Sequence, residues 1–296
     1  MQAVDLSAEH AVPPAVLPGR FADPHLVHFG DRYYLYPTTD GQPDWLATSF
    51  TAWSSTDLRQ WRADGVILDL PRDVRWALTR AWAPCMVARQ GRYYFYFSAD
   101  KNIGVAVGET PVGPFRDPLG GPLIRRGAFP CQVIDPMVFV DDDQQAYLYF
   151  GQGRAFVIPL NEDMISYDVG AAREITPVGA NEAMFMVKRR STYYLSWSEF
   201  DTRDPRYSVA YGTARSALGP FVRAVGNPIL SRKGAVQGTG HHSILQLPGE
   251  DAWVMAYHRF AVPGGDGFNR EVCLSRLHFG AGGEMLPVEV AGDFRL

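Results

Sequence analysis

The sequence has few cysteines, and they form no recognisable pattern. Only Cys85, Cys131 and Cys273 occur among 296 residues, and no Cys-x-x-Cys motif is present. An odd number of widely spaced cysteines argues against a disulfide framework and against a thiolate metal or redox motif. We therefore expect free, mostly buried thiols, which suit a reducing compartment.

Long apolar runs and blocks of one charge are also missing. No stretch reaches the ~18 apolar residues of a membrane-spanning helix, and the first ten residues lack the basic start and apolar core of a signal peptide. The net charge is −4, without a segment rich in lysine or arginine. This gives no electrostatic basis for binding nucleic acid or an anionic membrane. We expect a cytoplasmic protein, or a secreted one if a leader was removed from this sequence.

Several catalytic motifs are absent as well. The chain contains no His-Glu-x-x-His, no Gly-x-Ser-x-Gly, no Walker loop and no Gly-x-Gly-x-x-Gly. Zinc protease, serine hydrolase and nucleotide enzyme are therefore unsupported. No segment has a clear helical period, and the best helix candidate, residues 72–80, is short. The chain is almost entirely β in character.

What the sequence does contain is one pattern that occurs five times. Each copy begins with a polar residue or tryptophan, continues through a short apolar run and a turn, and ends in an aromatic strand. The copies open at Asp23, Trp82, Asp135, Glu182 and the His241–His242 pair. Their aromatic strands cover residues 33–36, 93–96, 147–149, 193–196 and 253–257.

This self-similarity predicts an all-β protein, a five-bladed β-propeller. Five copies in 296 residues amount to about 59 residues each, which suits a four-stranded blade with long outer loops. We find no linker, so we expect a single catalytic propeller domain over residues 1–296. Residues 1–17 would be a lead-in segment, which could add a strand that helps to close the ring.

The opening residues point to an active site. They lie 12 to 14 positions before the apolar residue in the middle of each aromatic strand. This predicts that they share one structural position, at the start of each blade's inner strand around the central channel. Three of them carry a carboxylate: Asp23, Asp135 and Glu182. Three carboxylates in one concave site cannot all ionise normally, so the pKa of at least one is raised.

A pair of carboxyls with split pKa values is what glycoside hydrolysis requires. One protonates the leaving oxygen, and the other activates water or attacks the sugar. Each residue also has a simpler interpretation. Asp-Pro is a common turn dipeptide, and only two of the four copies lie at a repeat opening; the four begin at Asp23, Asp117, Asp135 and Asp204. Glu182 alone would be a surface glutamate. The acidic segment 141–143 lacks the spacing of a calcium loop and reads as a solvated turn.

The ordered combination of these segments resembles glycoside hydrolase family 43, the five-bladed β-propeller glycosidases. The resemblance covers about residues 18–290 and rests on residues 21–24 with 33–36, 81–84, 134–137 with 141–143, 181–182 and 238–243. It implies an inverting mechanism. Asp23 would be the general base, Glu182 the general acid, and Asp135 would raise the pKa of Glu182 and hold its orientation. Ala183-Met184 stands where many relatives have Gly-Pro after the acid, which leaves the subfamily open.

The resemblance also implies roles for residues around the carboxylates. His241 matches the family's Gly-His segment near the channel axis, where some members coordinate Ca²⁺. His242 fits the strand count better and is assigned to substrate binding; ordinary channel lining remains an alternative for both histidines. Arg270 resembles a fifth-blade arginine that reaches the substrate, and Trp82 suits the apolar face of a sugar ring. No cofactor is expected for the chemistry, with Ca²⁺ near the axis as the candidate ion.

The expected function is an inverting, exo-acting glycoside hydrolase that removes a terminal furanose from an oligosaccharide or a polysaccharide side chain. An α-L-arabinofuranosidase is the leading expectation, with β-D-xylosidase and β-D-galactofuranosidase as alternatives within the family. Endo-arabinanase is less favoured, because nothing in the sequence indicates an open groove. The alternative from another class is a carbohydrate-binding propeller without turnover, against which three closely placed carboxylates argue.

Overall fold

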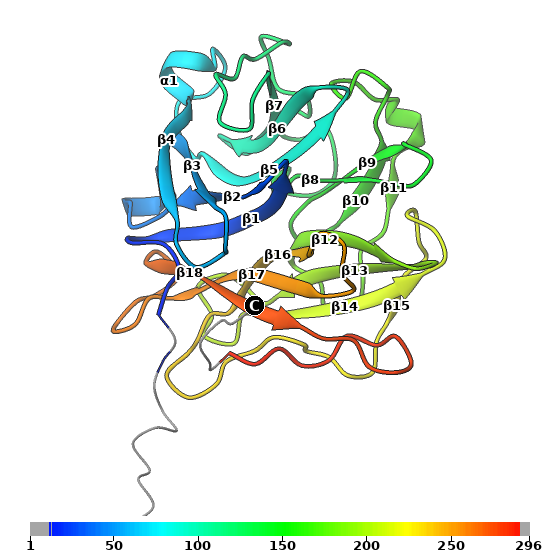
Figure 1. The fold of residues 1–296 in the computed structure, drawn as a ribbon. Helices are drawn as coiled ribbons and strands as arrows, with labels where there is room; N and C mark the ends of the chain where they lie inside the picture. The colour runs from blue at the N-terminus through cyan, green and yellow to red at the C-terminus, as the bar shows by residue number, and fades with distance from the viewer. Residues whose placement is uncertain (1–11, 13, 291–296) are drawn as a thin grey trace, which may run out of the picture.

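Five antiparallel sheets follow one another around a ring in the computed structural model, which describes residue 12 and residues 14–290 (Figure 1). Blade one contains β1 (Phe21–Phe29), β2 (Arg32–Thr39), β3 (Ser49–Ser55) and β4 (Arg62–Asp69). Blade two contains β5 (Trp82–Arg89), β6 (Arg92–Ala99) and β7 (Asn102–Gly108). Blade three contains β8 (Met137–Val140), β9 (Ala146–Phe150), β10 (Phe156–Pro159) and β11 (Arg173–Glu174). Blade four contains β12 (Glu182–Arg189), β13 (Thr192–Glu199), β14 (Ser208–Ala214) and β15 (Val222–Arg223), and blade five contains β16 (Gly240–Gln246), β17 (Trp253–Phe260) and β18 (Arg270–Leu277).

The predicted five-bladed propeller is confirmed, but the expectation of four strands in every blade is wrong for blades two and five. In the described part of the chain these two sheets have three strands each. Outside β7, blade two is paired only through isolated bridges, Ile103 to Ile124 and Val107 to Arg116. Four prolines between residues 109 and 123 interrupt that segment. Since proline lacks a backbone donor, a continuous outer ladder cannot form there.

Helix is confined to short pieces. The helix α1 (Leu70–Asp73) starts where the Asp69 side chain accepts a hydrogen bond from the Arg72 backbone nitrogen at 3.1 Å. It overlaps only the first two residues of the segment 72–80, the helix candidate from the sequence. The backbone is extended from Val74. Two single 3₁₀ turns are the other helical elements among the described residues, η2 (Pro43–Trp45) and η3 (Val169–Ala171). The weak helical period of that candidate segment therefore corresponds to mostly irregular structure.

The aromatic repeat has a structural cause. Equivalent tyrosines of blades one, two and three each donate a hydrogen bond to a backbone carbonyl of the next blade: Tyr36 to Pro111 at 2.7 Å, Tyr96 to Met164 at 2.6 Å and Tyr149 to Ala217 at 2.6 Å. The rings are fully buried between the sheets. A buried tyrosine must find a partner for its hydroxyl, and here the partner joins neighbouring blades.

The core lies between adjacent blades. Separate apolar clusters fill the spaces between blades one and two, between two and three, and between blades three, four and five. A fourth cluster closes the ring where blade five meets blade one, and it includes Leu17. The backbone nitrogen of Val16 donates to Val272 of β18 at 2.9 Å. Of the predicted lead-in, residues 1–11 and 13 lie outside the described residues, and the described remainder forms no strand.

A β-bulge begins the inner strand of four blades. The register shifts between Ala22 and His25 in β1, and equivalent shifts occur in β5, β12 and β16. One residue at each bulge, and its counterpart before β8, has a positive φ: Asp23, Ala83, Asp135, Ala183 and His241. Each of these five lies three residues before the position that pairs with the middle of the aromatic strand.

In the fifth blade His241 takes the shared position, although His242 fitted the strand count better. The prediction that all opening residues share one position is wrong for Trp82 and Glu182. They lie one residue earlier, at the position of Ala22 in blade one. The count misled because the longer hairpin turn of blade three gives Asp135 the same count of 13 as Trp82 and Glu182, whose blades have the short turn of blade one. The bulge nevertheless brings both positions to the same mouth of the channel, because an extra residue in a strand re-aims neighbouring side chains.

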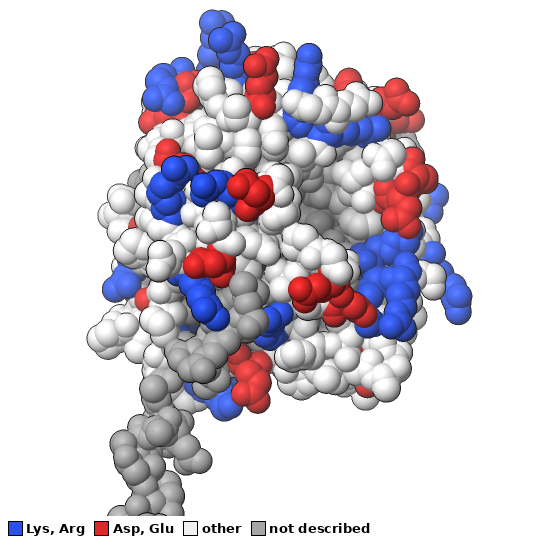
Figure 2. Space-filling model, in the orientation of Figure 1, with Lys and Arg blue, Asp and Glu red and all other residues white. Residues whose placement is uncertain are grey.

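The surface carries both signs of charge. On the face shown in Figure 2, basic and acidic side chains lie next to one another over much of the surface. Many of them are paired, as in Arg189 with Asp251 at 2.5 Å. All three cysteines are free, with Cys85 and Cys273 buried and Cys131 half-buried, so the prediction of free thiols is confirmed. None of the described helices is long and apolar enough to cross a bilayer.

Candidate active site

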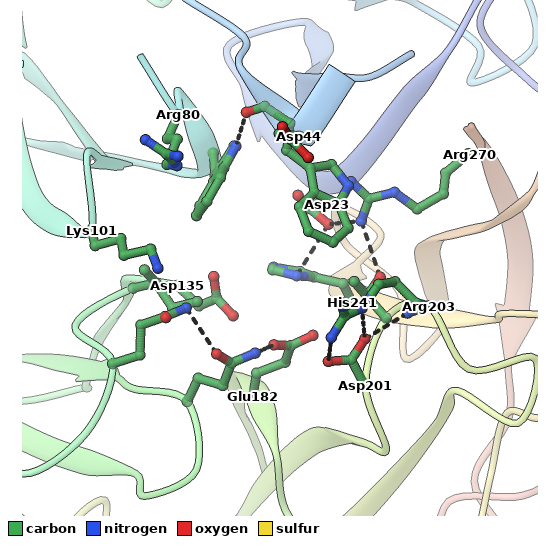
Figure 3. A pocket seen from close by; sticks show the side chains of 16 residues that line it. Asp23, Asp44, Arg80, Lys101, Asp135, Glu182, Asp201, Arg203, His241 and Arg270 are labelled. Carbon is green, nitrogen blue, oxygen red and sulfur yellow. Dashed lines mark hydrogen bonds and ion pairs between the residues drawn. The ribbon is translucent and has the colours of Figure 1, made fainter. Parts of the chain in front are cut away.

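A pocket of about 410 Å³ opens at the mouth of the channel where the inner strands begin (Figure 3). All five blades contribute to its lining. The sequence-predicted residues Asp23, Trp82, Asp135, Glu182, His241 and Arg270 all line it, and His242 does not. The loops after the second strands supply the upper wall, including Asp44, Trp45, Lys101, Gln152, Asp201, Thr202 and Arg203.

Asp23 lies at the first bulge and is held by cationic and imidazole groups. Its Oδ1 atom lies 3.2 Å from the guanidinium of Arg270 and 3.2 Å from Nδ1 of His241. Its backbone nitrogen donates to Nδ1 of His258 at 3.2 Å, which joins blade one to blade five. Among residues 14–290 the polar contacts of this carboxylate fall on Oδ1. The Oδ2 atom is thus left for a water molecule.

The surroundings of Asp23 favour its ionised form. Burial acts to raise the pKa of Asp23, but His241 and Arg270 act the other way and hold this pKa well below its ordinary value. Burial lowers the pKa of His241 below its usual value, so Arg270 provides the permanent charge. The guanidinium is itself fixed by Asp40, which accepts from Nε at 2.9 Å and from Nη2 at 3.1 Å. This bidentate pair sets the direction of the charge toward Asp23.

Glu182 has the opposite electrostatic character. Burial, together with the charge of Asp23, raises the pKa of Glu182 to about 7, against the hydrogen bonds from Tyr207 and Gln152. The Tyr207 hydroxyl donates to Oε1 at 2.7 Å, and the Gln152 amide donates to Oε2. A carboxyl with a pKa near neutrality can hold a proton and give it up, as a general acid must.

Asp135 is a structural link between blades three and four. In blades one, two and four, a hydroxyl at the end of the second strand accepts a hydrogen bond from the bulge nitrogen of the next blade: Thr38 from Ala83, Ser98 from Asp135 and Ser198 from His241. Blade three has Gly151 at this place, and the carboxylate of Asp135 accepts from the Ala183 nitrogen instead, at 3.2 Å. Burial and the charge of Glu182 raise the pKa of Asp135 well above its ordinary value.

Aromatic side chains form one wall of the pocket. The indole nitrogen of Trp82 donates to the Trp45 carbonyl at 2.7 Å, and the two rings meet edge to face. Trp45 stacks on Phe268 with ring centroids 4.2 Å apart, and its own indole nitrogen donates to Gly267 at 2.9 Å. The loop of blade one is therefore held between blades two and five. Trp45 and Trp82 thus line the same pocket as the carboxyls and give it an apolar part, as ligand-binding sites commonly have.

His242 lies below the pocket. Its ring lines a second cavity of about 20 Å³ inside the channel, together with His25 and Pro136. Its Nε2 atom lies 2.6 Å from the Ser196 hydroxyl, while Nδ1 is buried without a protein partner. A cavity of this size holds one water molecule, which would satisfy that nitrogen. Among the described residues no group of three or more His, Cys, Asp or Glu side chains could hold a metal ion.

Several residues of the site were not found from the sequence. They are Asp40, which orients Arg270; Tyr207 and Gln152, which bind Glu182; and His258, which supports Asp23. His258 directly follows the fifth aromatic strand, residues 253–257. It is equivalent to Thr38, Ser98 and Ser198 in the other blades. The polar residue that follows each aromatic strand was the signal that could have located it.

A five-bladed propeller whose channel mouth gathers one carboxyl with a lowered pKa and others with raised pKa values has the equipment of a glycoside hydrolase. The comparison with known proteins gives the family. The model of glycosyl hydrolases family 43 matches residues 13–285, and the chain belongs to this family of glycoside hydrolases. Enzymes of the family need no cofactor for catalysis.

Individual relatives agree with this assignment. A β-D-galactofuranosidase from Aspergillus niger is 36% identical over 291 residues, which cover 93% of this chain and 84% of that protein. The solved α-L-arabinofuranosidase from Clostridium thermocellum is 33% identical with a TM-score of 0.75, over 90% of this chain and 93% of that one. A thermostable family-43 glycoside hydrolase superposes with a TM-score of 0.83 at 26% identity, over 95% and 96% of the two chains.

Proposed function

We propose that this glycoside hydrolase inverts the configuration of its sugar, with Asp23 as general base and Glu182 as general acid. The observation that carries the proposal is the split between the two carboxyls. The pKa of Asp23 is held well below its ordinary value, while the pKa of Glu182 is raised to about 7. At neutral pH one is an ionised base and the other retains a proton, which is the division of labour that glycoside hydrolysis needs.

The reaction would proceed in one displacement. A water molecule bound to Oδ2 of Asp23 attacks the anomeric carbon as Asp23 takes its proton. At the same time Glu182 gives its proton to the glycosidic oxygen, which leaves with the aglycone. In this proposal the two carboxyls stand ~6.5–9.5 Å apart, with the water between them. Asp135 holds the backbone next to Glu182 through Ala183.

The shape of the pocket favours a terminal sugar. All five blades line the pocket around the mouth of the channel, which suits a single sugar unit that enters end-on. A sugar that enters through the mouth would reach the carboxyls. It could go no deeper, because the cavity of about 20 Å³ further down the channel holds only one water molecule. We therefore propose exo action on an oligosaccharide or on the side chains of a polysaccharide.

The sugar is proposed to be a furanose, with α-L-arabinofuranose first and β-D-galactofuranose second. The two have the same ring configuration and differ by an exocyclic hydroxymethyl group, so one pocket shape can suit both. An arabinofuranosidase and a galactofuranosidase are also the relatives with more than 30% identity described above. β-D-Xylosidase is the remaining alternative, and it would require a pyranose ring in the same place.

A panel of 4-nitrophenyl glycosides tests the proposal. Hydrolysis of the α-L-arabinofuranoside or β-D-galactofuranoside, well above that of the β-D-xylopyranoside, is expected. Proton NMR of the first-formed sugar should show the inverted anomer. A retained anomer would exclude the single displacement. Binding of these sugars without turnover would indicate the carbohydrate-binding alternative.

The calcium expectation concerns structure rather than chemistry. His241 turns Nδ1 toward Asp23, and the channel cavity of about 20 Å³ has room for one water. Ca²⁺ prefers six to eight oxygen ligands, which the described residues around His241 do not assemble. We propose that any ion near His241 is weakly held and that the carboxyls carry the acid–base chemistry without it.

A further inference from the structure

Two glutamines of blade three form a chain that ends on the carboxyl of Glu182. The side-chain nitrogen of Gln132 donates to the Gln152 amide oxygen at 2.8 Å, and the Gln152 nitrogen donates to Oε2 of Glu182. The dashed lines that lead to Glu182 in Figure 3 mark these bonds. Both amides therefore point their donors toward the carboxyl.

The backbone holds this chain in place from three sides. Gln132 and Gln152 form an isolated antiparallel bridge, with N–O distances of 3.2 Å and 3.0 Å. The loop around Gln152 is also tied to the residue before Glu182, because the Gly153 nitrogen donates to Asn181 at 2.8 Å. Gly151 has φ +116°, and a Cβ there would lie 2.3 Å from the Arg154 carbonyl oxygen. The turn that presents Gln152 thus requires glycine.

The polarity of the chain favours one state of Glu182. An amide donor stabilises an ionised carboxylate more than a neutral acid, because a charge-assisted hydrogen bond is the stronger one. A second amide that donates to the first increases the polarisation. The donors are set before the reaction, so no reorganisation is needed when the charge develops.

We propose that Gln132 is a positioning residue that acts on the general acid through Gln152, and that the glutamine chain stabilises the carboxylate left on Glu182 when its proton departs. This inference rests on the proposed role of Glu182 as the acid. Gln132 does not bond to Glu182 itself, so its effect must pass through the amide of Gln152.

The other groups around Glu182 make this stabilisation necessary. Asp23 and Asp201 oppose a further negative charge on Glu182, while the Tyr207 hydroxyl supports it from Oε1. The guanidinium of Arg203 also faces Glu182 but is engaged by Asp201 at 2.7 Å. Burial raises the pKa of Glu182, and the hydrogen bond from Gln152 lowers it; the net pKa is about 7. Without the chain, the acid would hold its proton more tightly and give it up more slowly.

The test compares Gln152→Met, Gln132→Met and the double variant on 4-nitrophenyl and phenyl α-L-arabinofuranoside, with β-D-galactofuranosides if those are the substrates. Gln152→Met should move the alkaline limb of kcat upward by roughly one to two pH units and lower kcat more for the phenyl leaving group. Gln132→Met should do the same to a smaller extent. In the Gln152→Met background it should add no further shift.

Two controls keep the result interpretable. Gln246 is exposed on β16, where its amide bonds only to Glu250, so Gln246→Met should match the unmodified enzyme in both profile and unfolding midpoint. If Gln132→Met lowers the unfolding midpoint, Gln132→Glu should be tested in its place. A carboxylate there would accept from Gln152, turn the amide oxygen toward Glu182, and raise the alkaline limb at least as far as Gln152→Met does.

The outcomes separate the two proposals. Gln132→Met could leave the alkaline limb unmoved and raise KM equally in the unmodified enzyme and in Gln152→Met. That result would show that Gln132 contacts the substrate, and the proposal that it acts through Gln152 would be wrong. If Glu182→Ala lost activity equally on both leaving groups, the role of Glu182 as acid would be wrong. A normal acid phenotype for Glu182→Ala together with an unmoved limb in Gln132→Met overturns only this inference.

Discussion

Replacing Arg270 with methionine should disable the proposed base through its charge. The guanidinium lies 3.2 Å from Oδ1 of Asp23 and is buried with it. A hydrogen bond to a charged group contributes about 1.5–3 kcal/mol, which corresponds to roughly one to two pH units. The substitution should therefore move the acidic limb of the kcat/KM profile upward by about that amount. The loss of rate should therefore grow as the pH falls.

The same substitution should weaken the fold. Asp40 loses both of its side-chain bonds to Arg270 and stays buried. Breaking a buried pair in this way costs about 3–5 kcal/mol. The sign of the pH dependence follows from Asp23, whose folded pKa lies below the ordinary value of 3.8. Its stabilising effect is complete above that value and is lost as the pH falls, so the deficit of Arg270→Met should shrink below about pH 4.

The pH dependence of kcat/KM on an aryl furanoside, measured with urea unfolding, separates the two effects. Asp40→Asn is the matched control. It keeps the Arg270 charge beside Asp23 but weakens the bidentate anchor, so it should lose stability while the acidic limb moves less than in Arg270→Met. If Arg270→Met lost stability with an unmoved acidic limb, the guanidinium would be structural and the reasoning about Asp23 would be wrong.

Three further outcomes are expected. Glu182→Ala should retain more activity on 2,4-dinitrophenyl than on phenyl glycosides, because a good leaving group needs little protonation. Asp23→Ala should lose activity on both substrates. If azide restored the activity of the two variants to the same extent, these roles would be contradicted. Asp135→Asn retains an oxygen that can accept from the Ala183 nitrogen, so its unfolding free energy should stay within about 1 kcal/mol of the parent. Asp135→Ala leaves this buried donor unpaired and should lose about 1–3 kcal/mol. Equal losses of the two variants in urea unfolding would show that the bond from Ala183 to Asp135 does not stabilise the fold. Activity should survive EDTA at least in part, and complete loss restored by Zn²⁺ but not by Ca²⁺ would reveal a catalytic metal.

The fold could be predicted because its repeat is local. Each copy carries its own turn and its own aromatic strand, and Tyr36, Tyr96 and Tyr149 recur because each bonds to the next blade. The three carboxyls were found because they stand at the openings of these copies. Blade two departs from the expected four strands because its outer segment is rich in proline, a signal that was present but outweighed by the repeat.

The sequence by itself determined the number of blades, the mouth at which the carboxyls gather and the identity of those carboxyls. Only the tertiary structure decided their register and their protonation. The hairpins of blades one and four are equally long, so the counts of 12 from Asp23 and 13 from Glu182 contain the one-residue offset. The longer hairpin of blade three gives Asp135 the same count of 13 as Glu182, and this concealed the offset, since a count along the chain cannot distinguish a bulge position from a longer hairpin. Ionisation depends on burial and on partners such as Asp40, Tyr207 and Gln152. These partners come from other strands and loops, and closure of the ring brings them together.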